Sequence, residues 1–401
     1  MALLLALVLT ALALLLWIPI AVLLAEVLLA VTSRRARAGT EPASPQPRPR
    51  VAVLIPAHDE ASTITPTLRS IIPQLRATDR LLVVADNCSD ATAAVARAAG
   101  AEVTERCDLT RRGKGYALDF GLRELRSAPP QVVIIVDADC QVAQGAIDHL
   151  SGECMRTERP VQALYLLYAP PGSGLKARFA QFANAVKNLV RASGLHRLGL
   201  PCQLMGSGMA FTWSCITRSQ FATGHIAEDL KIGLDLACSG RPPTFYPRAL
   251  VTSPLPASRE GLQSQRTRWE HGHLSVIVSD TTRLIRRAWV TRDGALLAFA
   301  LDLSVPPLSL LLLASAVLWL LSVALYTATA ERSALELTSG AMLALGAAVL
   351  LSWARYGRSI LSFGNIVLAP WYALWKIPLY ARFLVARQLE WVRSKRDHEA
   401  L

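Results

Sequence analysis

Residues 132–139 read VVIIVDAD, and this stretch decides the fold. The apolar, mostly β-branched run predicts a strand buried on both faces, as in a parallel sheet covered by helices. The strand ends in two carboxylates, Asp137 and Asp139, which are costly to remove from water unless something pairs them. Ligands of open α/β sheets bind beyond the carboxyl ends of the strands. Paired oxygen donors there suit a divalent cation that holds a diphosphate. The structural alternative is that Asp139 caps the next turn and Asp137 meets a surface lysine.

Two further apolar strands also end in acidic residues. VAVLI at 51–55 leads into PAHDE at 56–60, and LLVVA at 81–85 leads into DNCSD at 86–90. If these strands are parallel neighbours of residues 132–136, all three acidic clusters lie at one edge of one sheet. Carboxylates that repel one another at one edge indicate a ligand that uses them.

The composition indicates a membrane protein with a cytosolic domain. Of 401 residues, 52% are hydrophobic, and the mean hydropathy of +0.33 exceeds that of typical soluble proteins. The net charge is +12, and many basic residues flank apolar stretches, which fits membrane lipids and anionic small molecules as partners. No basic groove interleaved with aromatic residues and no zinc-finger spacing occurs, so we exclude nucleic acid. The seven cysteines include no C-x-x-C pair, which indicates reduced thiols.

The N-terminal apolar stretch, residues 2–31, exceeds the roughly 20 residues that a span needs. It predicts a transmembrane anchor over residues 1–33. Arginines follow at positions 34, 35 and 37. We expect an integral protein of a bacterial-type inner or plasma membrane. The positive-inside rule predicts that its N-terminus lies outside and that the next domain lies in the cytoplasm. Four prolines within residues 41–50 predict an extended linker over residues 34–50.

The C-terminal part contains three more apolar stretches. Spans are expected near residues 308–326 and 335–353. A span at 360–389 would place the basic tail at 393–396 outside the membrane, so this last stretch is expected to lie at the interface. Too few of the expected spans carry polar residues within the membrane, which disfavours a transporter.

Between residues 51 and 255, strand and helix patterns alternate. The basic loop RRGKG at 111–115 presents Lys114 and backbone N–H groups to phosphate oxygens, or is simply solvated. Gly206-Ser207-Gly208 allows a ligand close to the backbone, or forms an ordinary turn. Glu228 and Asp229 open a helix, where acids also complement the helix dipole. Further on, Gln265, Arg268 and Trp269 share one helix face, although arginine and tryptophan near a membrane are also common as interfacial anchors.

Taken in order, these features resemble the membrane-bound inverting glycosyltransferases of family 2, which include cellulose, chitin and hyaluronan synthases and ceramide glucosyltransferase. The resemblance covers roughly residues 51–280 and the flanking spans. It rests on D-x-D at 137–139, E-D at 228–229 and Q-x-x-R-W at 265–269. It implies an α/β GT-A fold, a Rossmann-like mixed sheet flanked by helices. The implied parts are a catalytic domain at 51–257, amphipathic interface helices with Q-x-x-R-W at 258–294, and a transmembrane or interfacial region at 295–401.

The same resemblance implies roles for individual residues. It implies that Asp86 contacts the base, Asp137 contacts the nucleotide, and Asp139 ligates a Mg²⁺ or Mn²⁺ ion that bridges the diphosphate. It implies that Asp229 is the general base and that Glu228, beside it, is the second catalytic residue. The remaining residues implied to bind substrates are Lys114, Ala57 and Glu60 in the donor pocket, and Gln265, Arg268 and Trp269 at the diphosphate or the acceptor.

The implied reaction is an in-line attack of an acceptor hydroxyl on the anomeric carbon of a nucleotide-sugar, with UDP-sugar the expected donor. The expected spans are too few to line a channel for a growing polymer. We therefore expect a non-processive enzyme that moves one sugar to a lipid or lipid-linked saccharide acceptor. Residues 206–208 also depart from the Phe-Phe-Cys-Gly pattern of the synthases. The alternatives are a processive synthase subunit, a polyprenyl-phosphate sugar transferase, a nucleotidyltransferase, and a non-catalytic membrane protein that binds a nucleotide-sugar or cation.

Overall fold

The computed structural model describes residues 2–32, 48–222 and 224–385. The linker expected at 34–50 falls largely outside these residues, as do the arginines at 34, 35 and 37 and the basic tail at 393–396. The chain divides into two compact units. One comprises residues 1–34, 172–198 and 277–387, and the other comprises residues 35–171, 199–276 and 388–401. Each is described by itself.

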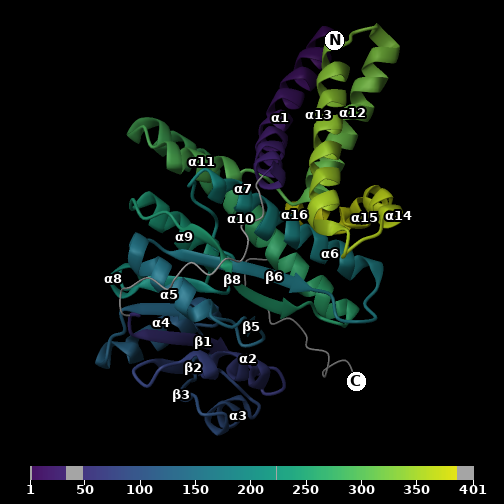
Figure 1. Cartoon of the computed structure of the whole chain (residues 1–401). Coiled ribbons are helices and arrows are strands. Elements are labelled where there is room, and N and C mark those ends of the chain that lie inside the picture. The colour runs from purple at the N-terminus through teal and green to yellow at the C-terminus, as the bar shows by residue number, and fades with distance from the viewer. Residues whose placement is uncertain (1, 33–47, 223, 386–401) are drawn as a thin grey trace. The chain divides into compact units, whose positions relative to one another are not determined.

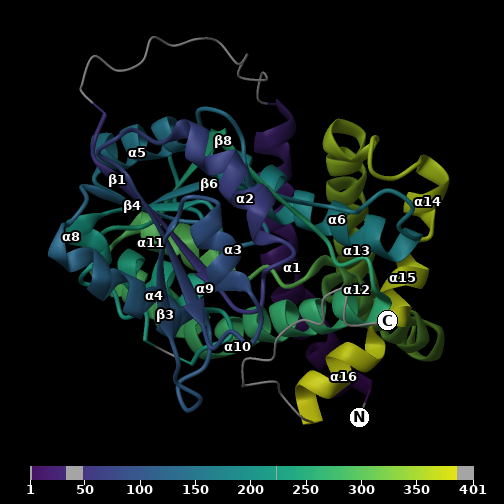
Figure 2. The ribbon, with the colours of Figure 1, turned by 90° about the horizontal axis from the view of Figure 1, so that it is seen from below.

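The second unit is built on an eight-stranded mixed sheet with the order β3-β2-β1-β4-β7-β6-β8-β5. The strands can be followed in Figure 1 and, from below, in Figure 2. Their bounds are β1 Val51–Ala57, β2 Arg80–Asp86, β3 Glu102–Arg106, β4 Val132–Ile135, β5 Gln141–Val142, β6 Val161–Tyr168, β7 Met209–Thr212 and β8 Thr244–Pro254.

The three strands that end in acidic residues are adjacent and parallel. β1 pairs with β2 on one side and with β4 on the other, so their carboxyl ends meet at one edge, as the sequence predicts. Val51–Ile55 and Val132–Ile135 are buried along their whole length, because helices cover the sheet. β7 is antiparallel to β4 and to β6, which makes the sheet mixed.

Helices of the second unit hold the sheet and position the strand ends. α4 (Lys114–Glu124) packs on β1 and β2, and it lies so close that a Cβ at Gly121 would be 2.5 Å from Leu54 Cδ1. α9 (Glu228–Cys238) adds Ile232 and Leu236 to the same core. The other helices are α2 Ile64–Ile71, α3 Thr92–Ala98, α5 Ala146–Thr157 and α8 Trp213–Ile216.

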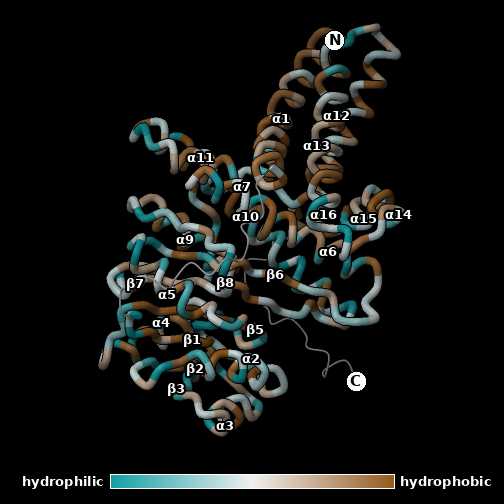
Figure 3. The backbone as a smooth tube through the Cα atoms, in the orientation of Figure 1, coloured by the Kyte–Doolittle hydropathy of each residue, from teal (hydrophilic) through white to brown (hydrophobic). Residues whose placement is uncertain are grey.

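Among its described residues, the first unit contains three helices long and apolar enough to cross a membrane. These are α1 (Ala2–Thr32), α12 (Leu308–Thr329) and α13 (Ser333–Ser352), which pack on one another. Figure 3 shows α1 as hydrophobic over most of its length. The expected mixed α/β fold and the N- and C-terminal candidate spans are thereby confirmed.

Shorter helices complete the first unit. They are α6 Leu175–Ala185, a π-helix at Val186–Arg191, α7 Ala192–Arg197, α11 Gly294–Leu303, a second π-helix at Trp353–Gly357, α14 Phe363–Val367, α15 Ala369–Trp375 and α16 Ile377–Val385. The residues of α10 (Arg259–Thr291) are divided between the two units.

Two acidic residues interrupt the apolar stretches of the first unit, and both pair with one arginine. Arg191 Nε lies 2.7 Å from Glu26 Oε2, and Arg191 Nη2 lies 2.6 Å from Asp302 Oδ1. All three side chains are buried. Removing Arg191 would leave two buried carboxylates without the arginine that pairs with both, which is strongly destabilising.

Candidate active site

Lys114, the first residue of α4, lies among acidic residues from two other parts of the sheet edge. Its Nζ atom is 2.5 Å from Asp137 Oδ1 and 3.8 Å from Glu228 Oε1. Asp137 directly follows the apolar end of β4, and Glu228 begins α9. The lysine expected to meet Asp137 in the structural alternative is therefore a largely buried lysine from the glycine-bearing loop. Its side chain is only 17% exposed.

The loop before β7 closes this cluster. Lys114 Nζ donates a hydrogen bond to the Gly206 carbonyl oxygen at 2.6 Å, and the Asp137 N–H donates to Ser207 Oγ at 3.1 Å. Gly206 has φ +94°, and a Cβ there would lie 3.3 Å from Asp229 Oδ2 and 3.8 Å from Lys114 Nζ. Glycine therefore keeps side-chain atoms out of the space between the lysine and Asp229.

Burial and mutual charge shift the pKa values of this cluster. Burial raises the pKa of Glu228 to about 7, although the charge of Lys114 opposes the change. Burial also raises the pKa of Asp137, against the same lysine. Burial by itself lowers the pKa of Lys114, but the charges of Asp137 and Glu228 outweigh it and raise the pKa above its usual value. Lys114 therefore stays charged beside carboxyl groups that titrate above their usual range.

The donors of this cluster fit a divalent cation. Asp137, Glu228 and Asp229 all act on the charge of Lys114, and the carboxylate of Asp139 raises the pKa of Asp137. Three carboxyl groups thus share one ammonium, and Asp139 acts on one of them, which leaves excess negative charge when all four are ionised. Hard carboxylate oxygens are the ligands that Mg²⁺ and Mn²⁺ prefer.

Asp86, at the end of β2, is held by an arginine from the next strand. Arg106 Nη1 lies 2.5 Å from Asp86 Oδ1, and both side chains are largely buried. Arg106 also donates to the Arg111 carbonyl oxygen at 2.8 Å and lies 5.7 Å from the centroid of the Tyr116 ring. Burial raises the pKa of Asp86, while Arg106 opposes that change. One arginine thus connects Asp86 to the basic loop that carries Lys114.

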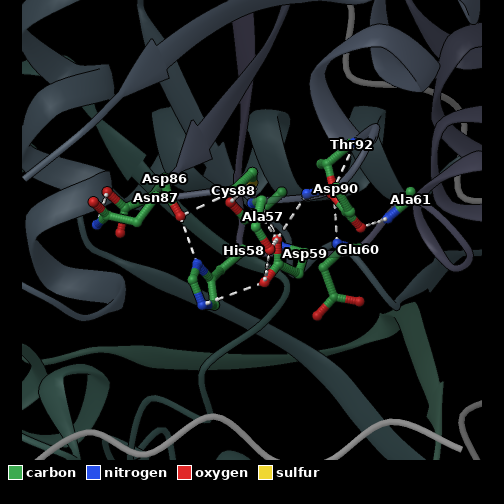
Figure 4. A network of polar contacts seen from close by, with 11 residues as sticks. Ala57, His58, Asp59, Glu60, Ala61, Asp86, Asn87, Cys88, Asp90 and Thr92 are labelled. Carbon is green, nitrogen blue, oxygen red and sulfur yellow. Dashed lines mark hydrogen bonds and ion pairs between the residues drawn. The ribbon is translucent and has the colours of Figure 1, made fainter. Parts of the chain in front are cut away.

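Ala57 and Glu60 lie in a separate set of contacts between the loops after β1 and β2, shown in Figure 4. The Ala57 carbonyl accepts from the Cys88 thiol at 3.5 Å, and the Glu60 N–H donates to Thr92 Oγ1 at 2.7 Å. His58 Nδ1 lies 2.7 Å from the Asp86 carbonyl oxygen. These contacts fix the ends of β1 and β2 relative to each other.

Asp59, Cys88 and Asp90 bring possible metal-ligating atoms within 4.8 Å of one another. Their carboxylates, however, already accept backbone hydrogen bonds. Asp59 Oδ1 accepts from the Ser89 N–H at 2.6 Å, and Asp90 Oδ2 accepts from the Ala61 N–H at 3.0 Å. These acids therefore join two loops, and we do not assign a cation to them.

Gln265, Arg268 and Trp269 lie on α10, as expected. A Cβ at Gly272 of the same helix would lie 3.2 Å from Ala227 Cβ, so α10 passes close to the residue before Glu228. Gln265 is buried, and its Oε1 atom has no hydrogen-bond partner among the described residues. Because buried polar atoms are normally paired, this amide is suited to a hydroxyl or a water molecule. Trp269 is 38% exposed.

Comparison with known proteins identifies the family of this chain. The model of the family described as "Glycosyltransferase like family 2" matches residues 47–272, which include the strand-end acids and Q-x-x-R-W. The chain belongs to this glycosyltransferase family. The family 2 assignment made from the motifs is thereby confirmed, and helices long and apolar enough to cross a membrane occur among the described residues.

Two similar proteins illustrate how far the likeness extends. "Probable glycosyltransferase YdaM" of Bacillus subtilis (strain 168) is 26% identical over 246 residues, which are 57% of this chain and 56% of the relative. The chain thus spans little more than half of that relative. The solved mannosyltransferase PcManGT from Pyrobaculum calidifontis, in complex with GDP-Man and Mn²⁺, is 20% identical with a TM-score of 0.52. The match covers 95% of this chain and 100% of the mannosyltransferase, and it supports the GT-A fold.

Some residues of the site did not emerge from the sequence. Arg106 ends a short, polar strand, and nothing in its local pattern separates it from a surface arginine. Ser207 was noted only as part of a glycine turn, yet its hydroxyl accepts from the Asp137 N–H and contacts Cys140 Sγ at 3.2 Å. Both residues are identified only in the folded chain, by their short distances from the acidic strand ends.

Proposed function

We propose that this family 2 member is an inverting, non-processive glycosyltransferase that moves one sugar from a nucleotide-sugar to a lipid or lipid-linked acceptor. In this proposal the catalytic part, residues 51–257, lies at the cytoplasmic membrane face and the N-terminus lies outside. UDP-sugar is the expected donor. GDP-sugars are a second candidate, because the solved mannosyltransferase of the same fold is in complex with GDP-Man.

The observation that carries the proposal is the position of Lys114 between Asp137, Glu228 and Gly206. A departing nucleoside diphosphate needs positive charge, and the acceptor hydroxyl needs a base. Lys114 supplies a cation, and Asp229 lies beside the same glycine. A site built only to sequester a cation would not need an ammonium among its carboxylates.

The donor side of the proposed site is formed by the strand ends. Asp86 binds the base, Asp137 contacts the nucleotide, and Ala57, Glu60 and Lys114 complete the pocket. Asp139 is the D-x-D residue assigned to Mg²⁺ or Mn²⁺, since Asp137 already pairs with Lys114. When bound, the cation would neutralise charge that develops on the leaving diphosphate.

In the proposed reaction, the carboxylate of Asp229 accepts the proton of the acceptor hydroxyl. The hydroxyl oxygen forms a bond to the anomeric carbon from the face opposite the diphosphate. The bond between this carbon and the diphosphate oxygen breaks, and its electron pair leaves with the nucleoside diphosphate. Lys114 stabilises the charge on this group. In-line displacement inverts the anomeric centre, so an α-linked donor gives a β-linked product.

Acceptor positioning is assigned to Gln265, Arg268 and Trp269 within the proposed interface region at 258–294. The Gln265 amide oxygen has no partner among the described residues, which suits an acceptor or sugar hydroxyl. We propose transfer of a single sugar because the three candidate spans among the described residues are too few to line a polymer channel. The region at 295–401 then anchors the enzyme to the membrane that holds its acceptor.

The test is nucleoside-diphosphate release by the full chain in lipid nanodiscs, with a panel of UDP-, GDP- and dTDP-sugars, each with and without Mg²⁺ or Mn²⁺. We expect metal-dependent release from one donor class that rises when lipid extract is added. Product analysis should show one added sugar with inverted configuration. Pyrophosphate release from nucleoside triphosphates would indicate a nucleotidyltransferase. A ladder of long products would indicate a processive synthase.

A further inference from the structure

The last three described helices, α14, α15 and α16, carry an apolar surface that no side chain of the described residues covers. It is formed by Phe363, Val367, Leu368, Trp371, Leu374, Ile377, Leu384 and Val385. Trp371 is 75% exposed and Leu384 is 79% exposed. On a helix at a water-exposed protein surface, this face would carry charged and polar residues.

The opposite side of the same helices is packed against the rest of the first unit. Tyr372 stacks on Phe179 of α6 with ring centroids 4.6 Å apart. Lys176 Nζ, also from α6, lies 3.7 Å from the centroid of the Trp375 ring. Tyr380 and Phe383 of α16 are buried. The helices are therefore fixed on one side and apolar on the other, so the exposed face is not simply the unpacked side of a loose segment.

Within the described residues, these helices are too short and too interrupted to cross a bilayer. α14, α15 and α16 contain 5, 7 and 9 residues, whereas a span needs about 20. Pro370 and Pro378 lie near the starts of α15 and α16. Each break exposes backbone groups that need hydrogen-bond partners, and the hydrocarbon core provides none. Water and headgroups at the membrane interface do provide them.

The described charged residues of this segment of the chain have one sign. Residues 337–385 contain Arg355, Arg358, Lys376 and Arg382 but no aspartate or glutamate. Arg358 and Arg382 are exposed. Basic residues beside an apolar helix face attract anionic lipids, at about 1 kcal/mol for each residue near the membrane surface.

The surface is also continuous with the candidate spans. α14 follows the C-terminal end of α13, and α15 contacts α12. Figure 1 shows the three short helices gathered at the end of the α1, α12 and α13 bundle that holds the C-terminal end of α13. Tyr372 and Ile366 belong to the same buried cluster as residues of α1 and α13.

We propose that α14–α16 form a membrane-surface platform that binds an anionic lipid leaflet. The exposed apolar residues enter the boundary between headgroups and acyl chains, and Arg358 and Arg382 contact lipid phosphates. The platform fixes the end of the helical bundle at one depth in the leaflet. This inference does not depend on the glycosyltransferase reaction.

The experiment uses spin labels on the full chain in nanodiscs. Cysteine replaces Val367, Trp371 or Leu384, one at a time, in a C107S background, because Cys107 is exposed. Power saturation with oxygen and with a water-soluble nickel chelate measures the depth of each label. A label on native Cys107, in the second unit, is the water-exposed control. We expect all three platform labels to favour oxygen and to lie at similar shallow depths, and the Cys107 label to favour the nickel chelate.

A second arm tests the lipid charge. Nanodiscs of neutral phosphatidylcholine are compared with nanodiscs that also contain anionic phosphatidylglycerol, for each labelled protein and for its R358Q/R382Q version. We expect the anionic lipid to deepen and immobilise the labels, and the double substitution to remove that response. The platform proposal would be wrong if the labels are accessible to the nickel chelate, or if their depths increase from label to label toward the bilayer centre. Equal depths in both lipids would overturn the anionic preference.

Discussion

The Nζ atom of Lys114, at the start of α4, lies 2.5 Å from Oδ1 of Asp137, which follows β4. This ion pair joins the glycine-bearing basic loop to the D-x-D sequence. It places a cation where the acidic ends of parallel strands meet. The donor pocket proposed above is organised around it.

Replacing Lys114 by methionine should lower turnover strongly, because methionine keeps much of the side-chain length but removes the charge. The loss of one preorganised charged donor costs about 10²–10³ in kcat. The measurement is kcat and KM for nucleoside-diphosphate release. K231M is the matched control, since Lys231 on α9 pairs with Asp235 at 3.9 Å. Near-normal kcat in K114M, with K231M also normal, would remove Lys114 from the reaction.

The substitution D229N should abolish sugar transfer and leave donor binding intact. The amide cannot accept the hydroxyl proton, and removal of a general base costs about 10²–10⁴ in rate. D235N is the control on the same helix, where the side chain is 54% exposed. Donor affinity is measured by calorimetry, and transfer by product formation. If D229N and D235N transfer equally well, Asp229 is not the base.

A methyl group at position 206 should impair catalysis more than it impairs folding. The Cβ of G206A would lie 3.3 Å from Asp229 Oδ2, inside the space assigned to the reacting groups. G100A is the control, because Gly100 has the same φ of +94° and a Cβ there meets nothing within 4 Å. Both variants carry a similar backbone strain of about 1–2 kcal/mol. We expect comparable melting temperatures and a kcat at least about tenfold lower in G206A. Equal activity in the two variants would contradict this placement of the site.

Glu228 should make the stability of the ligand-free protein depend on pH. Burial raises its pKa from 4.5 to about 7, so between these values the folded protein holds a proton that the unfolded chain has released. The free energy of unfolding must therefore fall as pH rises through this window, by at most about 1.4 kcal/mol per pH unit. Thermal melting of the wild type and of E228Q, from pH 4.5 to about half a unit above the raised pKa of Glu228, measures this pH dependence of stability. The difference between the two slopes isolates Glu228, and parallel curves would show that it titrates normally.

Sequence patterns predict the centre of this fold well, because the signal there is local. Short apolar runs that contain many β-branched residues and end in turn-forming residues indicate buried strands, which is why β1, β2 and β4 follow from the sequence. β8 did not follow from it. Its eleven residues alternate in burial and include Pro247, and its pairing with β6 shifts register between Ala163 and Leu164. A strand of this kind is determined by its neighbours, which lie far away in the sequence.

The same limit applies to charged residues. Glu26 and Asp302 were visible as interruptions of apolar stretches, but their common partner Arg191 lies 165 and 111 residues away. Nothing near Arg191 distinguishes it from other arginines. Likewise, the strand-end acids follow from local pattern, whereas the Asp86–Arg106 pair depends on the parallel contact of β2 with β3.

The central claim is that separate acidic strand ends meet around one cation and its nucleotide-sugar. It is tested most directly by anomalous diffraction from crystals grown with Mn²⁺ and the donor identified in the panel. The account predicts a manganese peak within coordination distance of Asp139 and of the donor diphosphate, and loss of this peak in D139N. A peak held by Asp59 and Asp90, with none at Asp139, would contradict it.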